Sequence, residues 1–448
     1  MSAPPRARET FGSRFGLLMA MIGVAAGLGN VWRFPYMVGR FGGLAFVLVY
    51  LAAVVFLGVP GLMAEWALGR HTKRGTVGAF ERAGLLGGRR IGWFFFFVVI
   101  AATAYYTAVM GWVLAHAAAA LAAGLGLRLD AAAVLPPARG FDGRAFLLQA
   151  GLTSLVILAC AGVLVRGLRR GIERASRLIT PVLFGALLLL ILRSVTLPGA
   201  AAGLDWYILK FDPSALDGRV VVAAVGQAMF SLSLGGTYMV VYGSYLRPAD
   251  DLRRNALLTA TGDTAVGLLA GLAIFPAVFA LGLEPGSGPG LLFETLPSVF
   301  ARVPAGWLFG FAFFGALFGA AYLSDIAAFE VLVAGITDNT GLGRRRAVWL
   351  VAGAVFLLSL PPTVSMRVFL PWDLTFGSGM QTLGALLAVL TVGWAIRRSD
   401  ALAELGAGGG RPFPRWLYYW LRFVIPGALV LVGAWWLLTD VLGVVGGV

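Results

Sequence analysis

The sequence has few charged residues, one cysteine and two histidines. Only 12% of its 448 residues are charged, whereas 59% are hydrophobic, a far more apolar composition than that of soluble globular chains. Cys160 has no partner for an intrachain disulfide, and His71 and His116 are too far apart in sequence to suggest a histidine-rich metal site. This scarcity gives little support to a membrane enzyme, which would need a nucleophile–base constellation or a metal cluster. The composition indicates an all-α polytopic membrane protein.

Apolar runs of about 20 residues recur along the whole chain, and each is long enough to cross a bilayer as a helix. The N-terminal segment lacks a small-residue cleavage site after its apolar run, so no cleavable signal peptide is predicted. We predict eleven spans, at about residues 14–37, 41–67, 91–124, 145–165, 173–196, 219–246, 255–282, 304–337, 346–362, 370–396 and 418–442.

The net charge of +14 raises the possibility of nucleic-acid binding, but the distribution of the charge argues against it. Most of the 35 Lys and Arg residues fall on one side of the predicted spans, in segments such as "RGLRRGIERASR" and "RPADDLRR". The positive-inside rule assigns that side to the cytoplasm. We therefore expect a multi-pass protein of the inner (plasma) membrane, with a cytoplasmic N-terminus and, for an odd number of spans, a C-terminus outside. We expect the lipid bilayer as a partner, and we expect no nucleic-acid partner.

Two spans are interrupted by residues that suit neither a helix nor hydrocarbon. The first contains "GVAAGLGNVWRFPY", in which Gly27 and Gly29 weaken the helix and Asn30 and Arg33 are costly in lipid. The sixth contains "SLSLGG" near its middle. The two breaks occupy matching positions in spans 1–5 and 6–10, which is typical of transporters built from inverted repeats. The alternative is that glycine and serine simply permit close helix packing.

A broken helix can bind a zwitterion together with a cation. Unwinding exposes carbonyl oxygens, and it points the amides of the second half-helix at an anion. An α-amino acid needs both kinds of group, whereas a channel would need repeated rings of carbonyls or charges, which are not evident. We predict one domain, 1–448, with repeat one at about 14–196, repeat two at about 219–396 and an extra span at about 418–442.

Five motifs occur in a specific order along the chain: "GLGNVWRFPY", "GVPGLMAEWALGR", "AYY", "VGQAMFSLSLGG" and "GLEPGSGPGLLFETLP". From about residue 8 to 400 the sequence resembles the neurotransmitter:sodium symporter family, particularly its bacterial leucine-transporter-like amino-acid transporters. The resemblance implies a leucine-transporter-type fold, with a 5+5 inverted repeat and spans 1 and 6 unwound at mid-membrane. Many relatives have twelve spans, and this chain has eleven predicted ones.

The resemblance also implies a substrate site at the two breaks. The carboxylate of an amino acid would meet the amides of Leu28 and Gly29 and the hydroxyl of Tyr106. Gly27 stands where monoamine-transporting relatives have aspartate, and glycine leaves room for the substrate's own carboxylate. The ammonium group would meet the carbonyls of three residues, with Ser233 nearby. These three are Ala25, Phe230 and Ser231.

The side-chain pocket is expected to be large. By the family pattern its walls are Ala102, Gly236 and Ala328, with Ser324 close by, and each of the three wall residues is smaller than its counterpart in leucine-transporting relatives. Unfilled apolar space is costly. We therefore expect a neutral, bulky hydrophobic or aromatic amino acid as the substrate.

One or two sodium ions are implied, and the first site is the clearer of the two. Its expected ligands are Ala25, Asn30, Ser231 and Asp263. No chloride requirement is expected, because Asp263 supplies a fixed carboxylate where chloride-dependent relatives have neutral side chains.

The second sodium site depends on the alignment register of span 8. Without a gap, Leu323 takes a ligand position and offers no donor, whereas a one-residue gap brings Ser324 and Asp325 to the site. We prefer the gapped register, because an unpaired carboxylate in a span is costly and sodium would neutralise it. The expected ligands are then Gly23, Ala26, Ala321, Ser324 and Asp325.

Charge pairs are expected to gate both mouths of the transporter. Arg33 and Asp373 match the family's extracellular gate, and Arg8, Tyr245 and Asp338 match its intracellular network. The function implied is sodium-coupled symport of an amino acid by alternating access, with no oligomer required. The alternatives are a proton-coupled or sodium-independent carrier and a non-transporting amino-acid sensor.

Overall fold

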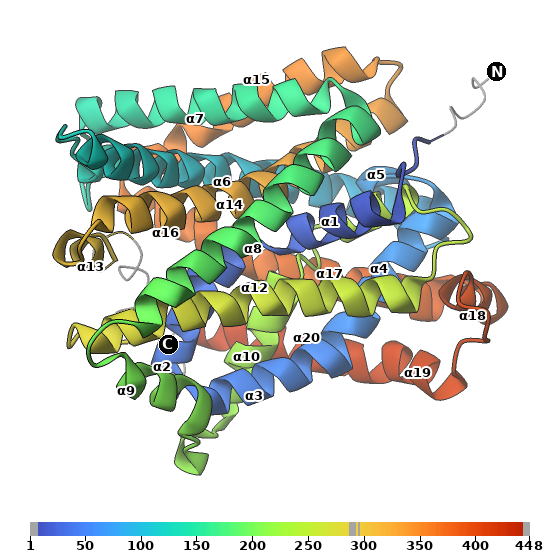
Figure 1. Cartoon of the computed structure of the whole chain (residues 1–448). Coiled ribbons are helices and arrows are strands. Elements are labelled where there is room, and N and C mark those ends of the chain that lie inside the picture. The colour runs from blue at the N-terminus through green and yellow to red at the C-terminus, as the bar shows by residue number, and fades with distance from the viewer. Residues whose placement is uncertain (1–7, 286–292, 294–295, 442–448) are drawn as a thin grey trace.

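The computed structural model describes residues 8–285, 293 and 296–441, and all the secondary structure in these residues is helical (Figure 1). The elements of the first half are α1 (Arg14–Ala25), η1 (Gly29–Arg33), α2 (Phe34–Arg40), α3 (Leu44–Ala53), η2 (Val54–Gly58), α4 (Val59–Thr72), α5 (Thr76–Arg82), α6 (Gly88–Gly124), η3 (Ala131–Val134), α7 (Gly143–Leu164), η4 (Leu168–Glu173), α8 (Arg174–Val195), α9 (Ala200–Leu204) and η5 (Asp205–Leu209).

The second half begins with a short turn and contains the second broken helix. Its elements are η6 (Pro213–Ala215), α10 (Gly218–Ser231), α11 (Tyr238–Ser244), α12 (Leu252–Ala280), α13 (Leu296–Arg302), α14 (Gly306–Asn339), α15 (Arg344–Ser359), η8 (Pro361–Thr363), α16 (Met366–Trp372), η9 (Asp373–Gly379), α17 (Met380–Leu390), η10 (Thr391–Ala395), α18 (Arg398–Gly406), α19 (Arg415–Tyr419), η11 (Trp420–Val424), α20 (Ile425–Trp436) and η12 (Leu437–Val441).

The helices follow the predicted spans closely. Within the described residues, nine helical stretches are long and apolar enough to cross a membrane, and the bent pair of α1 with η1 and α2 makes up to ten. The shorter apolar helix α10 and the following α11 occupy the sixth predicted range. The total of eleven spans stays a prediction.

Both predicted breaks coincide with interruptions of the helix. After α1 ends at Ala25 the chain direction changes by 55°. Between α10 and α11, the residues Ser233, Gly235 and Thr237 have positive φ angles of 52°, 91° and 57°, a conformation that only glycine adopts at little cost. At Gly235 glycine is also required sterically, because a Cβ atom would lie 1.6 Å from the carbonyl oxygen of Gln381.

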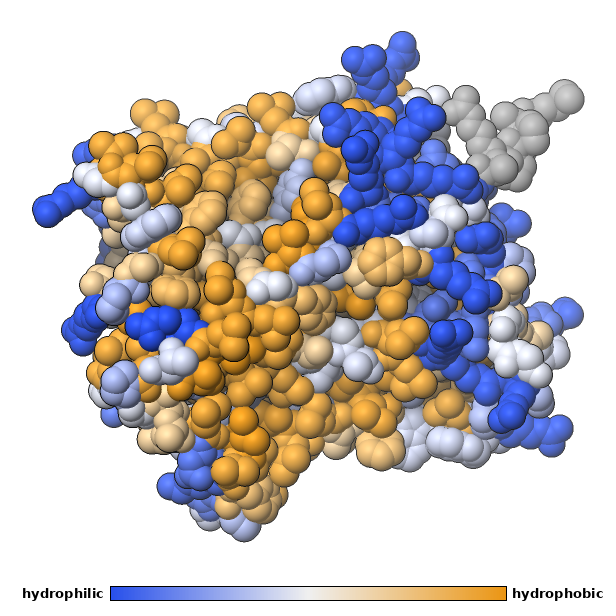
Figure 2. Space-filling model, in the orientation of Figure 1, coloured by the Kyte–Doolittle hydropathy of each residue, from blue (hydrophilic) through white to orange (hydrophobic). Residues whose placement is uncertain are grey.

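The long helices α6 and α14 pack along each other (Figure 1). In their most apolar 18-residue stretches, 83% and 78% of the residues are buried, against 28% for Leu168–Val195 and 24% for Arg415–Thr439. The uncovered surface is apolar, and Figure 2 shows a broad hydrophobic band with most hydrophilic residues gathered at the end where the N-terminus lies. This pattern is typical of helices that face lipid.

Candidate functional site

A cavity lies at the junction of the two broken helices. It encloses about 550 Å³ of space free of atoms, including its open mouth. We call it the central cavity. Its walls come from the break in α1–η1, from α6, α10, α11, α14 and from α17, and they are Val24, Ala25, Gly27, Leu28, Gly29, Ala102, Thr103, Tyr105, Tyr106, Phe230, Ser233, Tyr238, Ser324, Ala328 and Gln381.

The first break presents hydrogen-bond donors to the central cavity. The amide of Leu28 donates to the hydroxyl of Tyr106 at 3.3 Å, so the two groups predicted to receive a carboxylate lie together. A Cβ atom on Gly27 would lie 2.7 Å from Ser324 Oγ and 2.9 Å from the Tyr106 hydroxyl. Gly27 therefore keeps this wall open, since any side chain there would collide with two polar groups.

The second break covers the cavity from the opposite side. The ring of Phe230 packs against Gly29, where a Cβ atom would come within 2.8 Å of it. Ser233 donates its hydroxyl to the carbonyl of Val24 at 2.9 Å, which ties the two breaks together. An aromatic wall thus faces a polar one across the cavity.

The predicted side-chain pocket is only partly as expected. Ala102 and Ala328 line the cavity, but Gly236 does not. The ring of Tyr238 lies directly against Gly236 and is itself a wall of the cavity. The prediction that Gly236 enlarges the pocket is therefore wrong, because a tyrosine two residues later occupies the space that the missing side chain leaves.

The sequence reasoning missed Tyr238 and Gln381 as cavity residues. A signal for Tyr238 exists, since it is the first residue of the half-helix that follows the glycine pair. Gln381 lies on α17 in a stretch with no motif, and only the packing of α17 on Gly235 brings it to the cavity.

The residues predicted for the first sodium site form one buried cluster. The side-chain nitrogen of Asn30 donates to Ser231 Oγ at 2.9 Å and to the carbonyl and carboxylate oxygens of Asp263 at 2.9 and 2.7 Å. Ser231 also donates to the second carboxylate oxygen of Asp263 at 2.7 Å. The oxygens of Ser231 and Asp263 thus meet beside the amide of Asn30, whose own Oδ1 accepts from the amide of Gly27 at 3.1 Å. Carboxylate and hydroxyl oxygens suit a small hard cation. Ala25 lies at the same break and lines the cavity.

Two further residues support this cluster and were not predicted. Tyr50 donates its hydroxyl to Ser231 Oγ at 3.3 Å, and Gln227 donates to the carbonyl of Gly29 at 2.9 Å. Both side chains are fully buried. Gln227 thus joins α10 to the first break, and Tyr50 joins α3 to the end of α10.

The second predicted sodium site is divided in the structure. Ser324 Oγ lies 3.4, 3.1 and 3.5 Å from the carbonyl oxygens of Gly23, Val24 and Ala26, so the serine does face the first break. Ala321 lies one turn earlier on the same helix and is buried.

Asp325, predicted as a ligand beside Ser324, points elsewhere. Its carboxylate accepts from the hydroxyl of Thr107 at 3.1 and 3.2 Å and from the thiol of Cys160 at 3.7 Å. Successive residues on a helix are about 100° apart, so Ser324 and Asp325 cannot face the same carbonyls without a distortion of α14. The structure therefore corrects the placement of Asp325, which lies between α14, α6 and α7.

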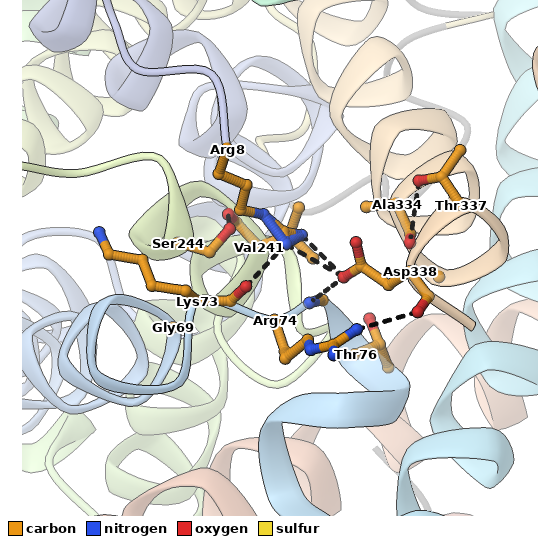
Figure 3. A network of polar contacts seen from close by, with 12 residues as sticks. Arg8, Gly69, Lys73, Arg74, Thr76, Val241, Ser244, Ala334, Thr337 and Asp338 are labelled. Carbon is orange, nitrogen blue, oxygen red and sulfur yellow. Dashed lines mark hydrogen bonds and ion pairs between the residues drawn. The ribbon is translucent and has the colours of Figure 1, made fainter. Parts of the chain in front are cut away.

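The predicted intracellular network is closed (Figure 3). Arg8 donates to the carboxylate of Asp338 through both terminal nitrogens, each at 3.0 Å, and to the carbonyl of Lys73 at 3.2 Å. The amide of Gly75 also donates to the carboxylate of Asp338 at 2.7 Å, and the guanidinium of Arg74 donates to the backbone carbonyl of Asp338 at 2.9 Å. The N-terminal segment is thereby fastened across the ends of α4 and α14.

A second set of contacts lies beside this network. Lys73 donates its ammonium group to the carbonyl of Leu246 at 2.6 Å, and burial, with nearby Arg70, lowers the pKa of Lys73. Arg70 in turn pairs with Glu404 on α18. These contacts join α4 to α18 and to the residues after α11 at the same end of the bundle.

Tyr245 belongs to the network, as predicted, through a route that the sequence did not indicate. The guanidinium of Arg8 lies 5.3 Å from the centre of the Tyr245 ring. The Tyr245 hydroxyl donates to Glu330, which accepts from Arg344 at 3.0 and 2.5 Å. Glu330 is fully buried, so it needs the paired charge of Arg344.

The predicted outer gate is not closed by an ion pair. Within the described residues, the side chains of Arg33 and Asp373 are not among the ion pairs that lie within 4.0 Å. The guanidinium of Arg33 lies instead 4.4 Å from the centre of the Phe230 ring, and Asp373 lies beside Tyr105. Of the two predicted charge pairs, Arg8–Asp338 is therefore formed, and Arg33–Asp373 is not formed within 4.0 Å.

A helical membrane bundle in which two broken helices meet at a mainly apolar cavity, beside the buried carboxylate of Asp263, has the architecture of a secondary transporter. The model of the sodium:neurotransmitter symporter family matches residues 8–128 and 145–438. The chain belongs to this family, whose members are sodium-coupled symporters rather than enzymes.

Relatives and solved structures agree with this assignment. The chain is 34% identical to the uncharacterized sodium-dependent transporter YhdH of Bacillus subtilis, over 94% of this chain and 96% of the relative. It is 26% identical to the sodium-dependent dopamine transporter of Bos taurus, over 95% of this chain and 68% of the relative. The crystal structure of MhsT in complex with L-phenylalanine is similar, with 33% identity, a TM-score of 0.82, and coverage of 95% of this chain and 99% of that one.

Proposed function

We propose that the chain symports a neutral hydrophobic amino acid together with sodium by alternating access across the inner membrane. The observation that carries this proposal is the pairing of the Leu28 amide and the Tyr106 hydroxyl in the same cavity as the Phe230 and Ser233 side of the second break. Donors for a carboxylate thus face acceptors for an ammonium group across the cavity. The oxygen cluster around Asp263 lies next to both breaks, where an ion would stabilise the same conformation as the substrate.

The arrangement of the chain in the membrane belongs to the same proposal. Eleven spans, unwinding of spans 1 and 6 at mid-membrane, the 5+5 inverted repeat, a cytoplasmic N-terminus and an outer C-terminus all fit the order of the helices and the basic residues. With this orientation, a closed Arg8–Asp338 pair and an open Arg33–Asp373 pair correspond to an outward-facing state. No oligomer is needed, since the cavity is built from one chain.

Sodium coupling has its best ligand set in Asn30, Ser231 and Asp263, with the carbonyl of Ala25. A second ion would use Ser324 with the carbonyls of Gly23 and Ala26, and Ala321 would add its own carbonyl. Asp263 brings a permanent carboxylate to the first site, so we propose that no chloride is required.

An aromatic amino acid is the substrate that the cavity favours. Ala102 and Ala328 leave space, and the rings of Tyr106, Phe230 and Tyr238 supply walls for an aromatic side chain. The complex of MhsT with L-phenylalanine supports the same substrate class. Tyr238 limits the pocket in the place of Gly236, so phenylalanine is expected ahead of tryptophan.

Transport in proteoliposomes tests the function. Purified protein should accumulate labelled phenylalanine when an inward sodium gradient is imposed, and replacement of sodium by choline at fixed pH should stop uptake. Sodium-independent uptake driven by a pH gradient would instead favour a proton-coupled carrier. Binding without any uptake or counterflow would favour a sensor.

Competition among amino acids tests the substrate class separately. Phenylalanine, tryptophan and leucine should compete better than alanine and glycine. Tyr238→Ala should raise the relative affinity for tryptophan by about tenfold, since one removed ring frees enough volume for a larger side chain. A preference for alanine or glycine would contradict the aromatic assignment without contradicting sodium symport.

A further inference from the structure

Two arginines and three aromatic side chains form a continuous cluster on the outside of the bundle. Arg422 lies 4.2 Å from the centre of the Trp394 ring and 5.5 Å from that of Phe423. Arg398 lies 5.2 Å from the Tyr419 ring, and Tyr419 stacks on Phe423 with the ring centres 6.3 Å apart. We call these five residues, Trp394, Arg398, Tyr419, Arg422 and Phe423, the Arg–aromatic cluster.

The cluster is exposed, although its rings are large and apolar. The exposed fractions of Trp394, Phe423 and Tyr419 are 54%, 53% and 42%. The helical stretch to which Tyr419 and Phe423 belong, Arg415–Thr439, is only 24% buried in its most apolar part, the lowest value among the nine long apolar stretches of the described residues. A face of this kind in a membrane protein is in contact with lipid, and aromatic rings there sit at the level of the headgroups.

The cluster lies at the basic end of the molecule. Arg70 at the end of α4 pairs with Glu404 on α18, the helix that begins with Arg398. The same end carries the Arg8–Asp338 pair, and Figure 1 shows α18 and α19 on the side where the N-terminus lies. Under the positive-inside rule this end meets the cytoplasmic leaflet, which is rich in anionic lipids.

The two arginines of the cluster differ in their partners from three other arginines at this end. Arg8, Arg70 and Arg344 each pair with a carboxylate. In the described part of the chain, neither Arg398 nor Arg422 has a carboxylate within 4.0 Å, and Arg422 Nε is buried without a hydrogen-bond partner. Stacking on a ring holds a guanidinium in place and leaves its N–H edge available, and that edge matches the geometry of a phosphate.

We propose that the Arg–aromatic cluster binds the headgroup phosphate of an anionic phospholipid. Arg398 and Arg422 would contact the phosphate, and the acyl chains would lie along α20, whose Val430 and Leu431 are 53% and 70% exposed. Charge complementarity favours an anionic lipid over a zwitterionic one. Arginines that serve only to orient the chain in the membrane do not need to be stacked on aromatic rings. The stacking of both arginines therefore favours a bound ligand. This lipid site is separate from the transport cavity.

Lipid-dependent stability and lipid retention test the proposal. The purified full-length protein in detergent is titrated with phosphatidylglycerol or with phosphatidylcholine of the same acyl chains, and Tm and bound lipid (by native mass spectrometry) are measured. The variant R398Q/R422Q removes both charges. The matched control is R89Q/R90Q, because Arg89 and Arg90 are exposed residues at the start of α6 at the same end of the bundle.

For the wild type and the control, phosphatidylglycerol should raise Tm by several degrees more than phosphatidylcholine does. R398Q/R422Q should retain phosphatidylglycerol about tenfold less well, with its Tm in phosphatidylcholine close to that of the wild type. Trp394→Leu should weaken retention without any change in charge, since it removes the ring on which Arg422 is held.

Four results would overturn the proposal. First, R398Q/R422Q could retain phosphatidylglycerol as well as the wild type does. Second, R89Q/R90Q could lose as much phosphatidylglycerol as R398Q/R422Q, which would indicate binding by general surface charge. Equal stabilisation by phosphatidylcholine would show that the headgroup charge is not recognised. Equal stabilisation by soluble glycerol phosphate would identify a site for soluble anions. Because native mass spectrometry counts lipid on folded protein, a loss of folding in the variant would be detected separately.

Discussion

Asp263 and Asp325 are both fully buried aspartates on long helices, yet their surroundings differ. Asp263 on α12 faces the two broken helices and shares hydrogen bonds with Asn30 and Ser231. Asp325 on α14 faces the unbroken helices α6 and α7 and accepts from Thr107 and Cys160. The two buried carboxylates therefore have different neighbours, and only Asp263 lies beside the broken helices.

The backbone around each carboxylate decides what it can bind. At a break, carbonyl oxygens that are freed from helical hydrogen bonds lie close to the carboxylate and can complete the coordination of a cation. Between packed, unbroken helices the backbone carbonyls already accept helical hydrogen bonds, so only side chains can interact with the carboxylate. Ser324 precedes Asp325 on α14 and faces the carbonyl oxygens of the first break. A difference of one position along the helix thus separates a candidate ion ligand from a carboxylate that faces the neighbouring helices.

The largest effect is expected at Asp263. Asp263→Ala removes the charged oxygen donor of the first cluster, and loss of an interaction of about 3 kcal/mol weakens sodium activation by roughly 100-fold. Uptake by proteoliposomes as a function of sodium concentration measures this change. Asp251→Ala is the control on the same helix, since Asp251 only caps the start of α12. Sodium activation within twofold of wild type in Asp263→Ala would remove the first site from the proposal.

An intermediate effect is expected at Ser324. Ser324→Ala removes one neutral oxygen that faces three backbone carbonyls, and a loss of about 1.4 kcal/mol corresponds to roughly tenfold weaker sodium activation. The same transport assay applies, and Thr107→Val is a control for polar-group loss on the Asp325 side. An unchanged sodium curve in Ser324→Ala would leave the cluster at Asp263 as the only candidate ion site among those considered.

A small effect on sodium is expected at Asp325. Asp325→Asn keeps an acceptor for Thr107 and removes the charge, so half-activation by sodium should change by no more than about twofold. Thermal unfolding in detergent, measured in parallel, reports whether the packing of α14 is preserved. A strong loss of sodium activation in a well-folded Asp325→Asn protein would restore Asp325 as a ligand and contradict its placement in the structure.

No effect is expected from chloride. Replacing chloride by gluconate should leave sodium-driven uptake within experimental error, because the fixed carboxylate of Asp263 already supplies the negative charge at the first site. Initial rates at saturating sodium are the measurement. A severalfold decrease would mean that Asp263 is neutral during transport, and it would make the two aspartates more alike than the structure suggests.

Much of the fold could be predicted from the sequence. Apolar runs set the helix positions to within a few residues, since α6 was expected at 91–124 and lies at Gly88–Gly124. The breaks, which the structure places at residues 26–28 and 232–237, were visible because glycine, serine and asparagine nearby are unsuited to the middle of an apolar helix. Local composition therefore determined where the helices run and where two of them are interrupted.

The predictions about the site that were wrong are those that depend on the direction in which a side chain points. Tyr238 fills the space beside Gly236, and Asp325 faces α6 rather than the first break. Neither fact follows from residue type, because a helix places neighbouring residues on different faces and only packing selects the face that meets a cavity. The chain's composition and motifs determined the class of protein and most of the residues around the candidate site. The tertiary structure decided which buried oxygen faces an opened backbone, because only packing selects the face of a helix that meets a break.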